Sequence, residues 1–483
     1  MGQDLWRARR RLFVRAVILA WTVLFGAMHV LEVAIPDQPG KIGFDTRMQL
    51  RWLERSLSDS DAELAQKTFP EGELFTYEFY GLALENVAET TRDPGDIARA
   101  AREVRAMLPK IDLLLAHAPF NSMARAPLRG GICWFAGQNL LRGRLIALVK
   151  DAHPTEVKRF HDDSATLARA FGASATGVLE AYPGMSWPVD SLFGYRSLQI
   201  HDSLYGTKYF GTFARFKQTM LRIQDRATGL MPAFVHLDGR PRDVPRGCAL
   251  SWSLAVLPDL DPDYAAEQWA AYRRSFGRCA WGLCLFREYP EDRSRGPDAD
   301  SGPIVGGLGM SASAFGLAAA RAQGDMDAAE SLRRTGELLG MPALSWWGKR
   351  YVGGRIALFD IFSVWTRTVP MPAKAPASMA WTPVLGLAAL WAGLAALAFR
   401  ALRRAREELR VAEGRSTRER ALFFAAAAGL ALHLIWPAFV GILLLVAFSL
   451  LDALSRKGSS RAPLTTPLRA VGSGYPAIKE MPR

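Results

Sequence analysis

Residues 187–206, WPVDSLFGYRSLQIHDSLYG, form a largely apolar stretch of helical length that is bounded by proline and glycine. Both residues punctuate helix ends for backbone reasons, so the stretch predicts one helix. Comparable apolar stretches recur with a rough period of about 53–60 residues, the size of two helices and their loops. They begin near Glu73, Gly131, Trp187, Gly247, Ser301 and Gly354.

An amphipathic helix is predicted after each of the first five apolar stretches. The linking turns are rich in Gly, Asp and Pro, as in TTRDPGD at 90–96, and the residues that follow show apolar side chains at helical spacing. A further helix near 46–58 precedes the first apolar one. Six such pairs predict an all-α (α/α)6 toroid with the apolar helices as its inner ring; a helical solenoid is the alternative. Strands are scarce, with one short hairpin expected at 231–241.

Three apolar runs reach or approach the length of about 20 residues that a membrane-spanning helix needs. They are residues 13–35, 382–402 and 421–451. The first predicts an uncleaved anchor, because it is longer than a signal-peptide core and no cleavage site follows it. The third contains Pro437 and is interpreted either as a hairpin within the membrane or as one tilted span.

The net charge of +13 is concentrated at the two ends of the chain. Residues 1–16 carry five arginines, and eight more lie between Arg400 and Arg420, whereas the middle is almost neutral. A nucleic-acid-binding domain should carry its basic residues on its folded surface, so the distribution argues against that class. Basic residues beside membrane spans remain cytoplasmic, which predicts a cytoplasmic N-terminus and an extracytoplasmic middle in a bacterial-type inner membrane.

These features divide the chain into a toroid and its flanking membrane segments. The predicted segments are a basic tail with an anchor (1–36), the extracytoplasmic toroid (37–378), a span (379–402), a basic cytoplasmic loop (403–420), a membrane hairpin or long span (421–455) and a disordered cytoplasmic tail (456–483).

The four cysteines give no clear framework. An extracytoplasmic location permits disulfides, but we do not predict a bridge between the neighbours Cys279 and Cys284. The seven histidines are scattered without metal-ligand spacing, so neither a metal nor a cofactor is predicted.

Chemistry is expected where loops lead into the inner helices, because these loops converge on one mouth of a toroid and helix N-termini favour negative charge there. The loop at 179–191 carries Glu180 and Asp190, and the loop at 286–303 carries Asp300. Carboxyl groups that share a cavity can divide into a general acid and a general base, so these three are the predicted catalytic residues. The predicted substrate-binding residues are Tyr182, Trp187, Arg246, Arg287, Glu288, Tyr289, Gln138 and Trp134.

A structural role is the alternative for each of these residues. Asp190 and Asp300 stand where helix N-caps belong, and capping alone would explain them. Arg246 and Arg287 would then serve as their ion-pair partners.

From about Phe75 to Val369 the chain resembles the linalool dehydratase/isomerase-like domain, an (α/α)6 fold. The similar stretches are FYGLALENVAETTRDP (79–94), GVLEAYPGMSWPVDSLFGYRSLQIHDSLYGTKY (177–209), DRATGLMPAFVHLDGR (225–240) and DADSGPIVGGLGMSASAFGLAAARAQGD (298–325). The resemblance implies a toroid with a central cavity.

The named enzyme of that family isomerises and dehydrates small monoterpene alcohols with acid–base residues that include two cysteines. Its cysteine positions fall near Glu180 and Asp190 here, and a cavity histidine falls near Gln138. The linalool reaction is therefore not carried over to this chain. A carboxylate pair is more typical of the (α/α)6 enzymes that act on glycans, a likeness of fold alone.

Three functions follow as hypotheses. The first is a membrane-tethered extracytoplasmic enzyme acting on a cell-envelope glycan or a lipid-linked substrate. The second is a lyase or isomerase acting on an isoprenoid alcohol. The third is a non-catalytic binding component of an envelope complex, whose membrane spans dock a membrane-protein partner.

Overall fold

A closed ring of six apolar helices forms the centre of the described chain. The structure is a computed structural model that describes residues 2–123, 128–345, 348–354, 357–372, 377–378 and 380–411. The ring consists of α4 (Gly72–Thr91), α6 (Gly131–Leu148), α8 (Pro188–Tyr205), α10 (Gly247–Leu260), α12 (Met310–Ala322) and α14 (Ala357–Thr368). Each helix contacts the next, and α14 contacts α4. This closure confirms the toroid and excludes an open solenoid.

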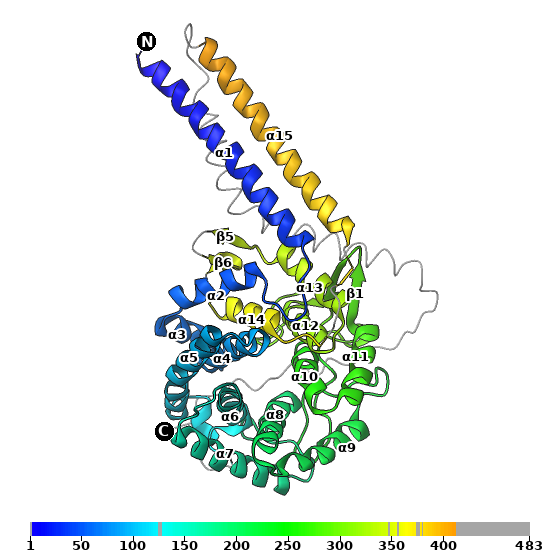
Figure 1. Cartoon of the computed structure of the whole chain (residues 1–483). Helices are drawn as coiled ribbons and strands as arrows, with labels where there is room; N and C mark the ends of the chain where they lie inside the picture. The colour runs from blue at the N-terminus through cyan, green and yellow to red at the C-terminus, as the bar shows by residue number, and fades with distance from the viewer. Residues whose placement is uncertain are drawn as a thin grey trace, which may run out of the picture.

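Amphipathic helices surround the ring, as the sequence predicted (Figure 1). They are α2 (Phe44–Ser56), α5 (Pro94–Leu113), α7 (Pro154–Ala173), α9 (Phe213–Ile223), α11 (Pro262–Phe276) and α13 (Met326–Leu339). Polar caps start several of them: the carboxylates of Asp93 and Asp261 accept backbone N–H groups of α5 and α11, each of which has proline in its first turn. An additional helix, α3 (Asp59–Thr68), packs against α4 and was not predicted.

Strands in the described chain occur as three short antiparallel pairs. They are β1 (Gly277–Ala280) with β2 (Leu283–Phe286), β3 (Ile304–Val305) with β4 (Leu308–Gly309), and β5 (Ala343–Ser345) with β6 (Gly348–Arg350). The β3–β4 pair delays the start of α12 to Met310, nine residues after the predicted start at Ser301. In the predicted 231–241 hairpin, Gly239 takes the left-handed turn conformation (φ +83°), but the flanking residues pair only at isolated bridges.

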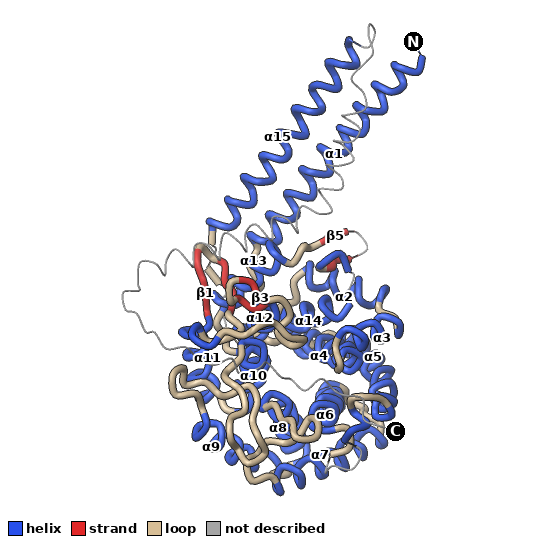
Figure 2. The backbone as a smooth tube through the Cα atoms, turned by 180° about the vertical axis from the view of Figure 1, so that it is seen from behind, coloured by secondary structure: helices blue, strands red, loops and turns tan. Residues whose placement is uncertain are grey.

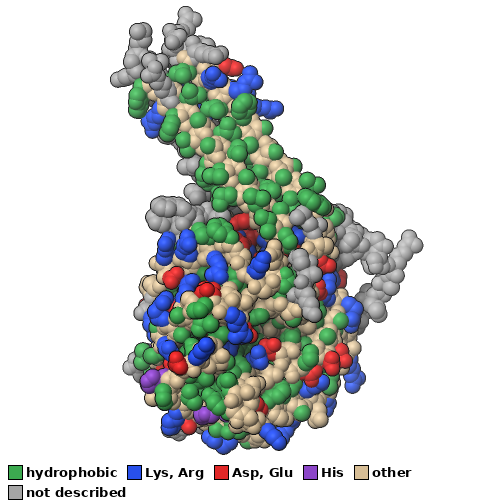
Figure 3. Space-filling view, viewed as in Figure 1, with side chains coloured by type: hydrophobic (Ala, Val, Ile, Leu, Met, Phe, Trp, Pro, Cys, Tyr) green, Lys and Arg blue, Asp and Glu red, His purple; other side chains and the backbone are tan. Residues whose placement is uncertain are grey.

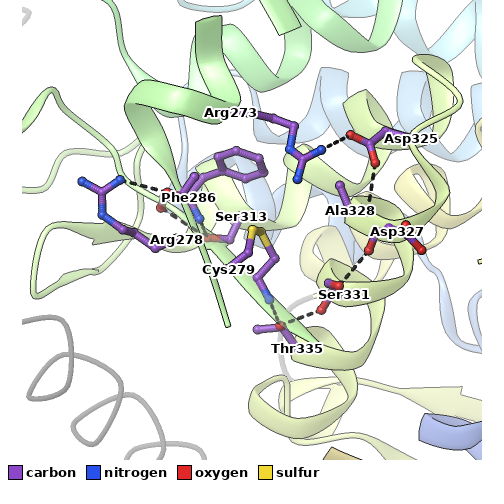
Figure 4. Close-up of a disulfide and its surroundings, with 12 residues drawn as sticks. Arg273, Arg278, Cys279, Phe286, Ser313, Asp325, Asp327, Ala328, Ser331 and Thr335 are labelled. Carbon is purple, nitrogen blue, oxygen red and sulfur yellow. Dashed lines mark hydrogen bonds and ion pairs between the residues drawn. A yellow bond between two sulfur atoms is a disulfide. The ribbon is translucent and has the colours of Figure 1, made fainter. Parts of the chain in front are cut away.

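Cys279 and Cys284 form a disulfide, contrary to our expectation from the sequence (Figure 4). The two residues lie directly opposite one another in the β1–β2 register, with their Cα atoms 4.0 Å apart. A sequence separation of five residues did not reveal this pairing, because only the hairpin register places the side chains face to face. Cys133 and Cys248 are free thiols.

Aromatic side chains meet on the axis of the ring. Phe79 of α4 packs against Trp252 of α10, Phe193 of α8 and Phe362 of α14, with ring centroids 5.0, 6.2 and 5.2 Å away. Phe315 of α12 joins them, 4.7 Å from Trp252. Because five of the six inner helices contribute to it, this cluster closes the centre of the toroid, and we call it the floor.

Two long apolar helices leave the rim of the ring side by side (Figures 1 and 2). They are α1 (Gly2–Ala34) and α15 (Trp381–Val411), and we call the pair the stalk. Within them, Trp6–Ala34 and Trp381–Glu407 are long and apolar enough to span a membrane, by length and composition alone. Apolar side chains cover much of the visible stalk surface, with basic ones near its far end (Figure 3).

The predicted C-terminal segments fall largely outside the described residues. Residues 403–411, assigned from the sequence to a basic loop, continue α15 as helix. The rest of that loop, the predicted membrane hairpin or long span at 421–455 and the tail at 456–483 are not described.

Candidate active site

The loops that lead into the inner helices lie on one face of the ring, turned toward the viewer in Figure 2. Two backbone contacts anchor them. The N–H of Ile132 donates to the carbonyl of Glu180 at 2.8 Å, and that of Gly247 donates to the carbonyl of Glu288 at 2.7 Å. A Cβ on Gly247 would come 2.1 Å from the carbonyl oxygen of Arg287, so only glycine permits this approach. We call this face the mouth.

Three carboxyl groups from distant parts of the chain act on one another at the mouth. Glu71 precedes α4, Asp190 lies in the first turn of α8, and Asp300 lies in the loop before α12. Burial raises the pKa of Asp190 well above its ordinary range, and the charges of Glu71 and Asp300 add to the rise. The Glu71 carboxylate also accepts the hydroxyl of Tyr182, which lies in the loop that leads into α8, so the segments carrying Glu71 and Asp190 are in contact.

The environments of these carboxyl groups separate their pKa values. Burial raises the pKa of Glu71 to about 7; a hydrogen bond from the Tyr182 hydroxyl opposes the rise, and the charge of Asp300 adds to it. Burial raises the pKa of Asp300 only to about 6, because the positive charge of Arg246 favours its ionised form. Asp300 therefore loses its proton more readily than Asp190 or Glu71.

Neither predicted aspartate is a helix cap. Trp187 occupies the N-cap position of α8, and Gly309 occupies that of α12. No side-chain cap bond closes either helix. The capping alternative for Asp190 and Asp300 is therefore wrong.

A second polar group borders the carboxyl cluster. Arg246, almost completely buried, forms ion pairs with Glu288 at 3.1 Å and with Asp298 at 2.8 Å. Its guanidinium lies over the ring of Tyr289, 5.3 Å from the centroid. The second oxygen of Glu288 accepts the backbone N–H of Cys248 at 3.2 Å. These contacts hold a positive charge at one edge of the mouth.

The other predicted residues do not join the carboxyl cluster. Glu180 accepts the N–H of Gly184 at 2.8 Å in its own turn and lines a separate pocket, together with Leu179 and Leu237. Trp134 donates to the carbonyl of Ile111 at 3.0 Å, toward α5. The remaining three are placed as follows: Gln138 accepts a bond from Arg142 within α6, Arg287 donates to the carbonyl of Tyr289, and Trp187 stacks on Phe234 at 4.8 Å.

Sequence reasoning did not assign a role to four residues at the mouth. Glu71, Glu78 and the two thiols Cys133 and Cys248 all have raised pKa values, chiefly because they are buried. The Cys133 thiol is influenced by Asp190, Glu71, Glu78 and Asp300, which places it among the carboxyl groups. The available signal was weak: Glu71 directly precedes α4, and Glu78 interrupts a largely apolar part of that helix.

The described residues contain no group of three or more His, Cys, Asp or Glu side chains arranged to hold a metal ion. What the cluster offers is proton transfer, because it combines a carboxyl whose pKa is raised to about 6 with one whose pKa is raised well above its ordinary range.

No family model and no curated protein matches the chain. Among solved structures, the chain is similar to one titled "Crystal structure of unsaturated glucuronyl hydrolase specific for heparin", with 13% identity and a TM-score of 0.45. The match covers 67% of this chain and 95% of that one. A likeness this remote carries no functional argument, and the resemblance to linalool dehydratase/isomerase stays a prediction.

Proposed function

We propose that this chain is a membrane-tethered enzyme whose toroid lies outside the cytoplasm and performs acid–base chemistry at its mouth. The observation that carries the proposal is the convergence of Glu71, Asp190 and Asp300, three carboxyl groups from different parts of the chain. Holding several partly buried carboxyl groups together is unfavourable for folding, so their retention at one point favours a functional role.

The pKa values suggest how the work is divided. Asp300 is the general base, because Arg246 keeps its pKa lowest of the three. Asp190 is the general acid, because burial and two neighbouring charges hold its proton. Glu71, which accepts the hydrogen bond of Tyr182, controls the charge beside Asp190. Pairs of carboxyl groups with separated pKa values are the usual basis of acid–base assignment.

The proposed substrate is a cell-envelope glycan or a lipid-linked saccharide. Aromatic rings border the mouth: Trp187 stacks on Phe234 in parallel and meets Tyr182 edge to face. Such rings suit the apolar faces of sugars. If the stalk spans a membrane, it holds the mouth beside the bilayer, where envelope glycans and lipid-linked precursors are found.

A second candidate is a lyase or isomerase acting on an isoprenoid alcohol. The aromatic floor favours it, because Trp252 and Phe362 remain only partly buried although both lie on the ring axis. An apolar chain reaching the floor would cover them. A non-catalytic binding role, with the stalk docking a membrane-protein partner, is the third candidate.

The experiment incubates the purified full chain, in lipid nanodiscs, with envelope oligosaccharides, lipid-linked saccharides and isoprenoid alcohols, and analyses the products by mass spectrometry. Hydrolysis adds one water to the substrate, whereas dehydration removes one. We expect hydrolysis, lost in Asp190→Asn and Asp300→Asn. Loss of water from an isoprenoid alcohol would support the second candidate instead, and binding without turnover would support the third.

A further inference from the structure

The β1–β2 hairpin ends in an exposed tryptophan beside the base of the stalk. Trp281 lies at the tip, and 59% of its surface is exposed. Trp381, the first residue of α15, is 61% exposed. The hairpin tip touches this part of the chain, because a Cβ on Gly282 would come 2.3 Å from the Cβ of Ala380. Two large apolar side chains are thus uncovered where the stalk meets the toroid.

The turn places Trp281 in a conformation that its side chain disfavours. The pairing of Ala280 with Leu283 leaves Trp281 and Gly282 as a two-residue turn, with φ of +53° and +80°. Turns of this kind favour Asn-Gly, because both central residues need positive φ. A bulky aromatic residue at the first position is an outlier. Outliers of this kind are retained where the side chain itself is needed.

The hairpin is fixed to its surroundings by covalent and polar contacts. The disulfide between Cys279 and Cys284 joins its two strands just behind the tip. Figure 4 shows the bond above α13, where the N–H of Cys284 donates to the hydroxyl of Thr335 at 3.0 Å. Leu283 packs with apolar residues of the stalk. The tip therefore cannot move independently of α13 and α15.

The stalk in turn is bound to the toroid by a buried ionic network. Arg333 of α13 donates to the carbonyl of Glu32, near the end of α1, at 2.6 Å. Lys349 lies 3.4 Å from the Glu32 carboxylate and 2.8 Å from Glu337, and neither Lys349 nor Glu337 is exposed to solvent. The height of the hairpin relative to the stalk is consequently fixed.

We propose that Trp281 and Trp381 insert into the headgroup region of the phospholipid bilayer and set the distance between the mouth and the membrane. Tryptophan favours this region, because its ring is apolar and its N–H remains hydrated. The lipid surface is the expected occupant because the exposed rings adjoin the helices that would cross it. The inference rests on the membrane placement of the stalk in the proposed function.

The experiment uses the full chain labelled with 5-fluorotryptophan in phosphatidylcholine nanodiscs. The Trp281→Phe and Trp381→Phe variants identify two fluorine resonances by their disappearance. Two paramagnetic probes are then compared. A lipid with a nitroxide near the headgroup broadens resonances of residues close to the membrane surface, and a water-soluble gadolinium chelate broadens those of residues exposed to water. Leu113→Trp supplies a control resonance at an exposed position on α5.

We expect the nitroxide lipid to remove most of the intensity of Trp281 and Trp381, and the chelate to remove little of it. The Leu113→Trp resonance should show the reverse. Trp21, in the middle of α1, reports separately on membrane insertion of the stalk. One outcome disproves insertion of the tryptophans but leaves the membrane placement of the stalk intact: Trp21 contacts lipid, while Trp281 is broadened by the chelate alone or by neither probe. If Trp21 is broadened only by the chelate, both the insertion of the tryptophans and the membrane placement of the stalk are disproved.

Discussion

Trp252 meets Phe79 on the axis of the toroid, with ring centroids 5.0 Å apart, although α10 and α4 stand on opposite sides of the ring. A contact across the full width of the ring limits how far a substrate can enter from the mouth. The carboxyl cluster at the mouth lies in front of this floor.

Removing the floor tryptophan should weaken the toroid and deepen the mouth. Trp252→Ala is expected to lower the free energy of unfolding by roughly 2–4 kcal/mol, somewhat less than for a fully buried tryptophan. The measurement is chemical denaturation of the full chain in detergent. Trp187→Ala, at the mouth, serves as the control and should affect KM more than stability. Equal stability losses in the two variants would contradict the role of Trp252 as the floor.

Substitution of the carboxyl groups tests the proposed catalytic roles. Asp190→Asn and Asp300→Asn should each lower kcat by about 10²–10⁴-fold, the usual contribution of a general acid or base. Glu180→Gln decides the remaining sequence prediction. Because Glu180 accepts the N–H of Gly184 in its own turn, we expect nearly unchanged kcat. A loss in Glu180→Gln as large as that in Asp190→Asn would restore Glu180 as a catalytic residue.

The pH profile should have an acidic limb near 6 and an alkaline limb at higher pH. Activity rises as Asp300, whose pKa is raised to about 6, loses the proton that a base must lack. It falls when Asp190 loses the proton that an acid must carry. Glu71→Gln removes a negative charge that raises the pKa of Asp190, so the alkaline limb of this variant's pH profile should move to lower pH. Glu180→Gln should leave both limbs in place, and a shift there would contradict the assignment.

The ring could be predicted from the sequence because helix period, turn residues and repeat length all agree. In WPVDSLFGYRSLQIHDSLYG, for example, the predicted bounds differ from those of α8 by only one residue at either end. The start of α12 was predicted too early, because the glycine-rich residues before it extend the apolar pattern without being helical. The Cys279–Cys284 bond depends on strand register, which apolar periodicity does not encode.

The site was only partly predictable, because loop position does not fix side-chain direction. Glu180 lies on the loop that leads to Asp190 in the first turn of α8, yet the turn at Gly184 draws Glu180 away from the cluster. Trp134 follows Cys133 in α6, and one helical residue is a rotation of about 100°, which turns Trp134 toward α5. Glu71 was missed because it stands beside Glu73 at the start of α4, and the apolar pattern does not distinguish the two.

The buried network at the base of the stalk should be essential for attachment of α1. Lys349→Met leaves the carboxylates of Glu337 and Asp45 without that partner, 2.8 and 3.2 Å from the lost ammonium group. Breaking a buried ion pair typically costs about 3–5 kcal/mol. Thermal unfolding of the full chain in nanodiscs measures the loss. Lys158→Met, which removes an exposed pair with Asp162, is the control and should change stability by less than about 1 kcal/mol.

Glu78 should make the protein less stable as pH rises. Its carboxyl lies against α6 so closely that a Cβ on Gly137 would come 1.8 Å from Oε1, and burial raises its pKa well above 4.5. Above pH 4.5 the unfolded chain releases this proton while the folded chain keeps it. The contribution to stability is therefore complete below pH 4.5 and is lost progressively as pH rises toward the folded-state pKa.

Glu78→Gln keeps the shape of the side chain and replaces the ionisable carboxyl with an amide that does not titrate. At pH 4 the unfolding free energies of the variant and the parent should differ by less than about 1 kcal/mol. At higher pH the variant should become more stable than the parent, by about 1.4 kcal/mol for each pH unit over which burial delays the ionisation of Glu78. Urea denaturation at pH 4, 6 and 8 measures this divergence. Glu180→Gln serves as the control, because Glu180 accepts the N–H of Gly184 in its own turn. Parallel stability curves for Glu78→Gln and the parent would show that Glu78 is ionised in the folded protein.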